Sequence, residues 1–309
     1  IHKITGSQLG GLSFDIKNIE ASSIKIYGHK GGMLPEIIME NRTNDLDEIP
    51  VEVVDNNANN RLDGDDYIRF YAQPSGKWEF VNGHYIFEQN VYTDESYVYL
   101  TFNGTNAKNI KVKASGEGLY SKKTIDYFYD VVHHERDEVN FIASGRLWFG
   151  NEFRVNSNQT FNHSFKEVKV SLPGIFTHRF AGRAIGVTSS LNITVNGQNS
   201  LLHNFSKVSG DYDETHSILK AKSDSFTLTG NTVEILYSYN NNGGEGNGWI
   251  DYYTLEVPVK LGLYGAQKIA RSKEAVDFDI VTYQFDMNNS EYNVWDVTNF
   301  FDVSKQQLY

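Results

Sequence analysis

The sequence predicts an all-β protein: a β-rich N-terminal domain, then a jelly-roll-like β-sandwich and a short strand-rich C-terminal connector. Tyr and Phe number 19 each against 3 Met, a balance that favours half-buried strands over helices. Several short segments alternate apolar and polar residues, and turn signals separate them. Stretches with the apolar period of an amphipathic helix are absent or short.

Asparagine–glycine pairs mark the hairpins that we expect. They lie between alternating segments at Asn82-Gly83, Asn103-Gly104 and Asn196-Gly197. Asn-Gly tolerates the positive φ angles of a type I′ turn, whose twist matches that of the strands it joins. We expect a fourth turn at Gly230-Asn231, between two further strand-like segments.

Three segments are expected to differ in role. A glycine-rich polar stretch at 115–118 suggests a boundary, which gives an N-terminal domain at 1–118. Strands and turns recur at the spacing of a β-sandwich over 119–260. The large residues of 249–257 predict a central strand that is buried on both faces. Residues 261–309 are expected to form a connector that leads toward a following element.

Composition excludes several classes of function. The formal net charge of −11 argues against binding to the phosphate backbone of nucleic acid. Without cysteine, these residues hold no disulfide, thiolate zinc site or cysteine nucleophile. No apolar run approaches the roughly 18 residues of a spanning helix, so any membrane association would depend on a partner. The chain starts at Ile1 without a visible signal peptide, and we expect a processed or trimmed segment.

One loop carries the pattern of a calcium site. Residues 55–66 read DNNANNRLDGDD. Oxygen-bearing side chains fall at loop positions one, three, five, nine and twelve: Asp55, Asn57, Asn59, Asp63 and Asp66. Position seven, where calcium loops use a backbone carbonyl, is Arg61. Asn60 at position six tolerates the left-handed conformation of a sharp turn. The sequence therefore predicts one Ca²⁺ ion held by these side chains and the Arg61 carbonyl.

An alternative interpretation of the loop stays open. The flanking residues 51–54 and 67–71 are strand-like, so the site would be a strand–loop–strand variant. Asp66 in place of glutamate at position twelve is expected to weaken bidentate coordination. The loop would otherwise be a polar turn whose Asp and Asn side chains cap their own backbone.

No catalytic residue is predicted in this segment. Residues 133–138 read HHERDE, which lacks the HExxH pattern, and a solvated charged loop is the expectation there. The other histidines are scattered singly, and the sequence gives no reason to join them into a triad.

Five segments, in family order, carry a resemblance to a known family. They are 23–36 (SIKIYGHKGGMLPE), 64–71 (GDDYIRFY), 144–153 (SGRLWFGNEF), 248–252 (GWIDY) and 294–298 (VWDVT). In these the chain resembles the sortases of the type IX secretion system, the PorU family of gingipain-like cysteine peptidases. The likeness is to the region N-terminal to the peptidase domain, so no catalytic residue can be carried over.

The resemblance implies a role at the cell surface. Family members are cysteine endopeptidases and transpeptidases that remove the sorting domain from secreted cargo and join the new end to a surface acceptor. The implied partners are the outer-membrane barrel PorV, other attachment-complex proteins and sorting-domain-bearing cargo. The implied location is extracytoplasmic, at the cell surface and peripheral to the bacterial outer membrane. This segment would scaffold the peptidase.

A carbohydrate-binding β-sandwich module of a secreted or surface protein is the alternative. Aromatic faces stack on sugars, the chain is rich in Tyr, and calcium stiffens such sandwiches. Against it, most of the aromatic residues alternate along strands and are expected to form the core.

Overall fold

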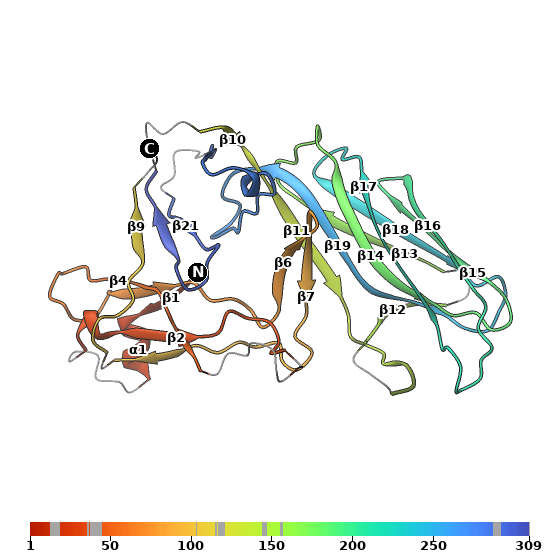
Figure 1. Ribbon diagram of the computed structural model, residues 1–309, viewed down its shortest axis with the longest axis horizontal. Coiled ribbons are helices and arrows are strands. Elements are labelled where there is room, and N and C mark those ends of the chain that lie inside the picture. The colour runs from red at the N-terminus through yellow and green to blue at the C-terminus, as the bar shows by residue number, and fades with distance from the viewer. Residues whose placement is uncertain are drawn as a thin grey trace. The chain divides into compact units, whose positions relative to one another are not determined.

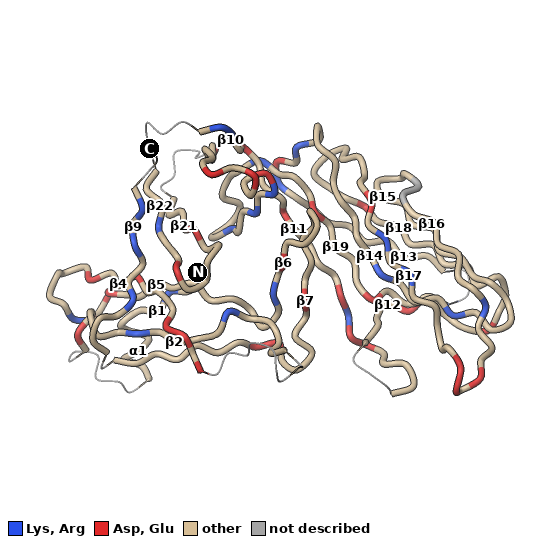
Figure 2. Tube along the Cα trace, viewed as in Figure 1, with Lys and Arg blue, Asp and Glu red and all other residues tan. Residues whose placement is uncertain are grey.

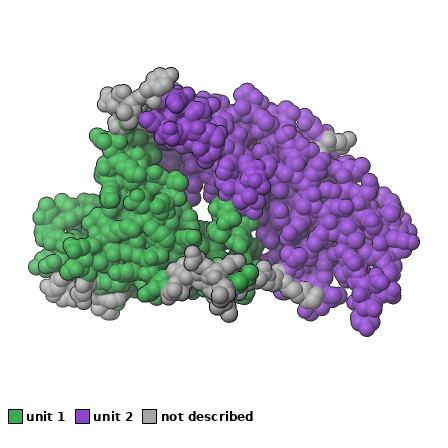
Figure 3. Space-filling view, viewed as in Figure 1, with its two compact units in different colours: residues 1–79, 87–119, 288–309 green, residues 80–86, 120–287 purple. Residues whose placement is uncertain are grey.

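The structure is a computed structural model that describes residues 1–12, 19–35, 37, 45–102, 104–114, 116, 121–143, 147–154, 157–286 and 292–308. The chain divides into two compact units (Figure 3). Unit 1 comprises 1–79, 87–119 and 288–309, and unit 2 comprises 80–86 and 120–287. The C-terminal stretch 288–309, expected in a connector, thus belongs to unit 1. No helix in the described ranges is long and apolar enough to cross a membrane.

Unit 1 is built from small sheets of short strands (Figure 1). The first sheet has the order β1-β5-β4, with β1 at His2–Thr5, β5 at Tyr67–Phe70 and β4 at Val51–Val54. The second has the order β3-β2-β8, with β3 at Asp47–Ile49, β2 at Lys25–Gly28 and β8 at Tyr99–Thr101. The third has the order β21-β22-β9, with β21 at Val294–Asp296, β22 at Ser304–Gln306 and β9 at Lys111–Lys113.

Short helices complete unit 1. Helix α1 spans Gly6–Gly11 and begins with a capping box, in which the Thr5 side chain accepts from Gln8 N–H and the Gln8 side chain accepts from Thr5 N–H. A 3₁₀ turn, η2, spans Ala21–Ser23. The core of the unit gathers the alternating inward side chains of the strands, among them Ile26, Ile49 and Ile68.

A hairpin of β6 (Lys77–Val81) and β7 (His84–Glu88) has its tip, 80–86, in unit 2. Its turn residues Asn82 and Gly83 have φ angles of 51° and 82°. Positive φ at both positions is the type I′ geometry predicted from the Asn-Gly pair.

Unit 2 is a β-sandwich of two antiparallel sheets. One has the order β11-β19-β14-β17: Tyr127–Glu135, Gly248–Lys260, Gly174–Gly182 and Ile218–Phe226. The other has the order β13-β18-β15-β16: Ser157–Ser164, Thr232–Asn240, Ser189–Val195 and Gln198–Phe205. Consecutive strands from β13 on alternate between sheets except at β15-β16. This is the strand order of a jelly roll, so the predicted fold class is confirmed.

Shorter elements border the sandwich. They are β10 (Lys123–Ile125), η3 (Phe141–Ala143), β12 (Gly150–Phe153), η4 (Glu274–Asp277) and β20 (Val281–Tyr283). Strand β12 pairs with β19, and β10 pairs with β20 in parallel.

The predicted central strand is confirmed, and one expected turn has a different role. Strand β19 pairs with β11 on one side and β14 on the other. The turn Asn196-Gly197 joins β15 to β16 with φ angles of 51° and 73°. Gly230-Asn231, in contrast, links β17 to β18, which lie in different sheets. The connection crosses between the layers because Phe226 and Leu228 turn into the shared core. Asn103 lies outside the described residues.

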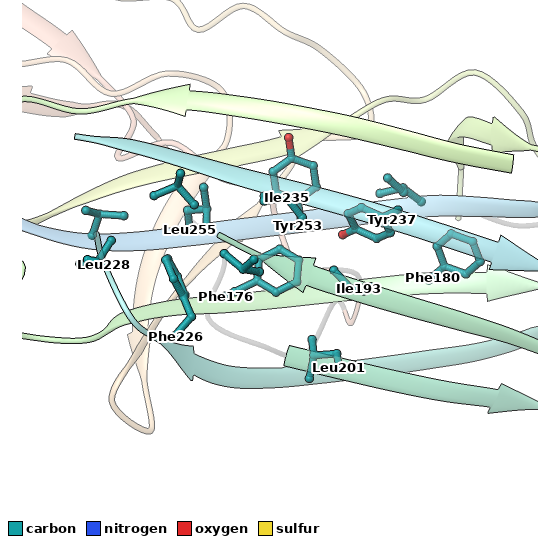
Figure 4. Packing of buried hydrophobic residues seen from close by; sticks show 14 of the residues in the cluster. Phe176, Phe180, Ile193, Leu201, Phe226, Leu228, Ile235, Tyr237, Tyr253 and Leu255 are labelled. Carbon is teal, nitrogen blue, oxygen red and sulfur yellow. The ribbon is translucent and has the colours of Figure 1, made fainter. Parts of the chain in front are cut away.

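Aromatic and aliphatic side chains from both sheets fill the layer between them (Figure 4). Tyr237 and Tyr253 are fully buried there and face each other from opposite sheets. Phe180 contacts the rings of Phe153 and Tyr239. Alternation along long strands therefore places most aromatic residues of unit 2 in the core, as the sequence predicted.

Candidate metal centre

The loop 55–66 connects two paired strands of unit 1. Strands β4 and β5 run antiparallel, from Val51 opposite Phe70 to Val54 opposite Tyr67. The loop therefore begins and ends at the same edge of one hairpin. This is the strand–loop–strand arrangement that the flanking residues predicted.

Side-chain oxygens at loop positions one, three and five accept hydrogen bonds from backbone N–H groups within the loop. The Asp55 carboxylate accepts from the backbone N–H groups of Asn59 at 3.3 Å and Asn60 at 2.7 Å. The Oδ1 of Asn57 accepts from Asn59 N–H at 3.1 Å, and the Oδ1 of Asn59 accepts from Arg61 N–H at 2.7 Å. Such Asx turns bring side-chain oxygens to the inside of a loop.

The turn at position six has the conformation that the sequence allowed. Asn60 has a φ of 56°, in the left-handed region that asparagine tolerates better than most residues. Ala58, two residues earlier, has the same φ of 56°. Two left-handed residues in one short loop give it the sharp reversal that a calcium loop needs.

Asp63 draws two amide side chains together. Its Oδ1 accepts from Asn57 Nδ2 at 3.2 Å, and its Oδ2 accepts from Asn59 Nδ2 at 2.9 Å. The structure therefore brings positions three, five and nine together, and Asn59 links them to Asp55 at position one.

Asp66 has a different role from the other acids. Its side chain is 2% exposed, and its two oxygens accept from Asn56 N–H at 2.8 Å and Asp63 N–H at 2.9 Å. The carboxylate thereby ties the start of the loop to its end. In the described ranges, no three His, Cys, Asp or Glu side chains are grouped so as to hold a metal ion. Calcium binding by the six predicted residues stays a prediction.

A neighbouring segment supports the middle of the loop. Leu62 is fully buried, its N–H donates to the Ile19 carbonyl, and Ala21 N–H donates to the Asn60 carbonyl. Glu20 and Arg61 face each other between these two bonds as a non-hydrogen-bonded pair. In such a pair the N–H and C=O of each residue point away from the partner strand. The Arg61 carbonyl therefore points away from residues 19–21.

Helix α1 supports the end of the loop. Gly6 N–H donates to the Asp66 carbonyl at 2.9 Å, and Ser7 Oγ donates to the Gly64 carbonyl at 2.9 Å. A Cβ on Gly6 would lie 3.2 Å from the Asp63 carbonyl carbon, so little space separates helix from loop. Sequence reasoning missed these contacts, because nothing in residues 5–7 or 19–21 marks them as partners of a distant loop.

The expectation of a solvated charged loop at 133–138 is partly wrong. His133, His134 and Glu135 end strand β11, because they pair with Thr254, Tyr253 and Tyr252 of β19. His133 lies 2.8 Å from Glu135 Oε2 and 3.1 Å from Thr254 Oγ1. Thr254 is only 3% exposed, so this hydroxyl is not open to a substrate and the three residues do not form a nucleophilic site.

Comparisons with known proteins agree with the sequence resemblance. No family model and no curated protein matches the sequence. The structure matches dimeric latent PorU from Porphyromonas gingivalis with a TM-score of 0.77 and 18% identity, over 99% of this chain. The chain spans 28% of the length of that PorU chain. The resemblance to PorU is thus confirmed as a shared fold that extends over both units.

Partial matches to carbohydrate-binding modules are much weaker. A family 36 module in complex with calcium and xylotriose matches 41% of this chain with a TM-score of 0.27 and 14% identity. A family 35 module from an environmental isolate matches 48% of this chain with a TM-score of 0.28 and 13% identity. These modules are covered at 98% and 99% of their own lengths, but the likeness is too low to support an inference.

Proposed function

We propose that this chain is a non-catalytic region of a PorU-like cell-surface sortase and that it scaffolds a peptidase domain. The observation that carries the proposal is the shared fold, at a TM-score of 0.77 over 99% of the chain. The sequence contains no cysteine, so a cysteine peptidase cannot use a nucleophile from these residues. Cleavage of the sorting domain would therefore belong to a different part of the parent protein.

The proposed setting is extracytoplasmic, at the bacterial outer membrane. We propose docking on the barrel PorV, together with other attachment-complex proteins, as the family resemblance implies. A binding measurement between this chain and PorV from the same organism, in detergent or nanodiscs, tests this role. Saturable binding with a Kd in the micromolar range or tighter supports it, and absence of binding at higher concentrations contradicts it.

A cleavage assay tests the non-catalytic part of the proposal. The chain is incubated with a sorting-domain-bearing cargo protein, and the products are followed by mass spectrometry. We expect the cargo to remain intact. Specific cleavage at the sorting domain would contradict the proposal.

We also propose that loop 55–66 binds one calcium ion. The donor set fits: each amide oxygen of Asn57 and Asn59 uses one lone pair in its turn and has a second for a cation. The carboxylates of Asp55, Asp63 and Asp66 and the Arg61 carbonyl supply further hard oxygen ligands. An ion that binds only the folded state adds RT ln(1 + [L]/Kd), about 2.7 kcal/mol at a hundredfold excess over Kd.

A surface of unit 1 favours glycan binding as a second function. Residues 97–102 alternate, so that Val98, Leu100 and Phe102 pack on the core while Tyr97 and Tyr99 face out, 65% and 57% exposed. Tyr27 on β2 lies directly opposite Tyr99 on β8, on the same face of the sheet. These tyrosines form an aromatic strip, unlike the buried aromatic residues of unit 2, and exposed ring faces can stack on sugar rings.

The glycan function has its own test. A screen of neutral and anionic glycans with the whole chain is compared with the double variant Tyr97→Ala/Tyr99→Ala. Binding that the double variant loses supports the second function. A matched variant, Tyr212→Ala, removes a 92% exposed tyrosine elsewhere and should leave binding unchanged. No binding to any glycan would contradict it.

A further inference from the structure

Two histidines face each other across the sandwich of unit 2. His178 lies on β14 and His203 on β16, and these strands belong to opposite sheets. Their Nε2 atoms are 2.9 Å apart, within hydrogen-bonding distance. His178 is fully buried and His203 is 7% exposed. The pair is therefore a polar link through the apolar layer between the sheets.

The surroundings of the pair are aromatic. The Phe176 ring stacks on His178 with centroids 5.5 Å apart, and the Tyr237 ring stands edge-on to it at 6.0 Å. Phe205 lies 6.2 Å from His203. His178 Nδ1 makes no hydrogen bond to any residue that the structure describes. A positive charge on either ring would thus be separated from water without a carboxylate or a new hydrogen bond from the described residues to stabilise it.

Charged groups near the pair are mainly positive. Lys222 of β17 lies directly opposite His178, and Lys220 precedes it on the same strand, which carries basic residues (Figure 2). Asp224 of β17 is already paired with Lys222 at 3.3 Å. On the other flanking strands, the described residues directly opposite the pair are uncharged: Tyr253 of β19 lies opposite His178, and Leu191 of β15 lies opposite His203.

We propose that His178 and His203 form an acid-sensitive lock between the two sheets of the sandwich. In the neutral pair one Nε2 donates and the other accepts, so the rings share one hydrogen bond. When both rings are protonated, both Nε2 atoms carry hydrogen and the bond is lost. The two positive charges then repel each other and the nearby lysines. The sheets would separate where β16 and β17 form the edges of the sandwich.

Burial sets the direction of the pH dependence. It lowers the pKa of His178 to about 3, with smaller contributions from His203 and Lys222. Burial also lowers the pKa of His203, with Lys222 and Lys220 adding to the effect. The unfolded chain, with a histidine pKa of about 6.5, therefore takes up protons first. The stability that the pair contributes is complete above about pH 6.5 and is lost as pH falls below this value. For each histidine, the equilibrium constant for opening rises by up to roughly tenfold per pH unit.

The edge location predicts where opening starts. Residues 219–223 of β17 are exposed, although β17 is hydrogen-bonded to β14 along its whole length. Among the strands that the structure describes, β16 is paired within its own sheet with β15 alone. Loss of the histidine pair would therefore free β16 and β17 before it disturbs β19, which has partners on both sides.

Hydrogen exchange of the whole chain at pH 7.5, 6.5 and 5.5, corrected for intrinsic rates, tests the lock. We expect the protection of β16 and β17 to fall by roughly 10- to 100-fold between pH 6.5 and 5.5. His203→Gln keeps an amide that can hydrogen-bond to His178 and should reduce this pH dependence by roughly tenfold. The matched control is His163→Gln. His163 lies on β13, where its ring is hydrogen-bonded to the Tyr253 hydroxyl of β19, and its replacement should not change the pH dependence of protection in β16 and β17. Unchanged protection at pH 5.5, or an unchanged pH dependence in His203→Gln, would overturn the proposal.

A second measurement covers the case in which His203→Gln does not fold. Ring proton resonances of the histidines are followed by NMR in the unaltered chain from pH 7.5 to 5. The proposal expects His178 not to titrate while the sandwich remains folded. Titration of His178 near pH 6.5 with its core resonances unchanged would refute the lock.

Discussion

The two units stabilise their strands in different ways. In unit 2, strands β13 to β19 are seven to 13 residues long and enclose a continuous aromatic core. In unit 1, each strand of the three small sheets has only three or four residues. Short strands bury less apolar area, so hydrogen bonds from loop side chains contribute a larger share of the stability. We therefore expect the stability of unit 2 to come mainly from its apolar core and that of unit 1 to come in larger part from the hydrogen bonds of loop 55–66.

The largest effect is expected in the core of unit 2. Phe180→Ala should lower the free energy of unfolding of this unit by about 3–5 kcal/mol, because it leaves a cavity among Phe205, Tyr237 and Tyr239. Urea unfolding followed by tryptophan fluorescence measures the loss. Leu202→Ala removes a 64% exposed side chain from the outer face of β16 and should change stability by less than about 0.5 kcal/mol. Equal effects of the two variants would contradict a stabilising core.

A smaller effect is expected at the closure of the loop in unit 1. Asp66→Ala removes a buried carboxylate that accepts two backbone N–H groups, and we expect a loss of about 1.5–3 kcal/mol in unit 1. Asp65→Ala, at the adjacent exposed position, is the matched control and should have little effect. Thermal unfolding of both variants separates the outcomes. An equal loss of stability in Asp65→Ala and Asp66→Ala would contradict the expected contribution of the loop to unit 1.

The smallest effect is expected at the left-handed turn of the loop. Asn60→Val places a β-branched residue at a φ of 56° and should cost about 1–2 kcal/mol. Asn60→Gly should be nearly neutral, because glycine adopts this conformation freely. A stability ranking of the two variants by differential scanning calorimetry checks this. A valine variant as stable as the glycine variant would show that the backbone at this position is not constrained.

The sequence predicted features that depend on local patterns. The Asn82-Gly83 and Asn196-Gly197 turns and the central strand at 249–257 all follow from neighbouring residues. The fold class could be predicted for the same reason. The Asx turns of the loop belong to its alternative interpretation, a polar turn that caps its own backbone. The Gly230-Asn231 turn shows what local sequence cannot predict, because the same residue pair can join two strands of one sheet or two strands of different sheets.

Features that depend on distant pairs could not be predicted. The buried Glu256 carboxylate lies 2.7 Å from Lys273 Nζ, and that ammonium donates to the Gly83 carbonyl in the hairpin tip 80–86. Neither the pairing of His178 with His203 nor the support of the loop by residues 19–21 leaves a signal in the local sequence. Such contacts depend on the register of strands that lie far apart in the chain.

Hydrogen exchange of the whole chain with excess calcium and with excess chelator tests the dependence of unit 1 on its loop most directly. We predict that chelation lowers protection in β4, β5, residues 19–21 and α1, and leaves β14, β18 and β19 of unit 2 unchanged. Asp55→Ala should show the chelated pattern under both conditions. Identical protection with and without calcium, together with no heat of calcium binding by calorimetry, would contradict the account and identify the loop as a polar turn.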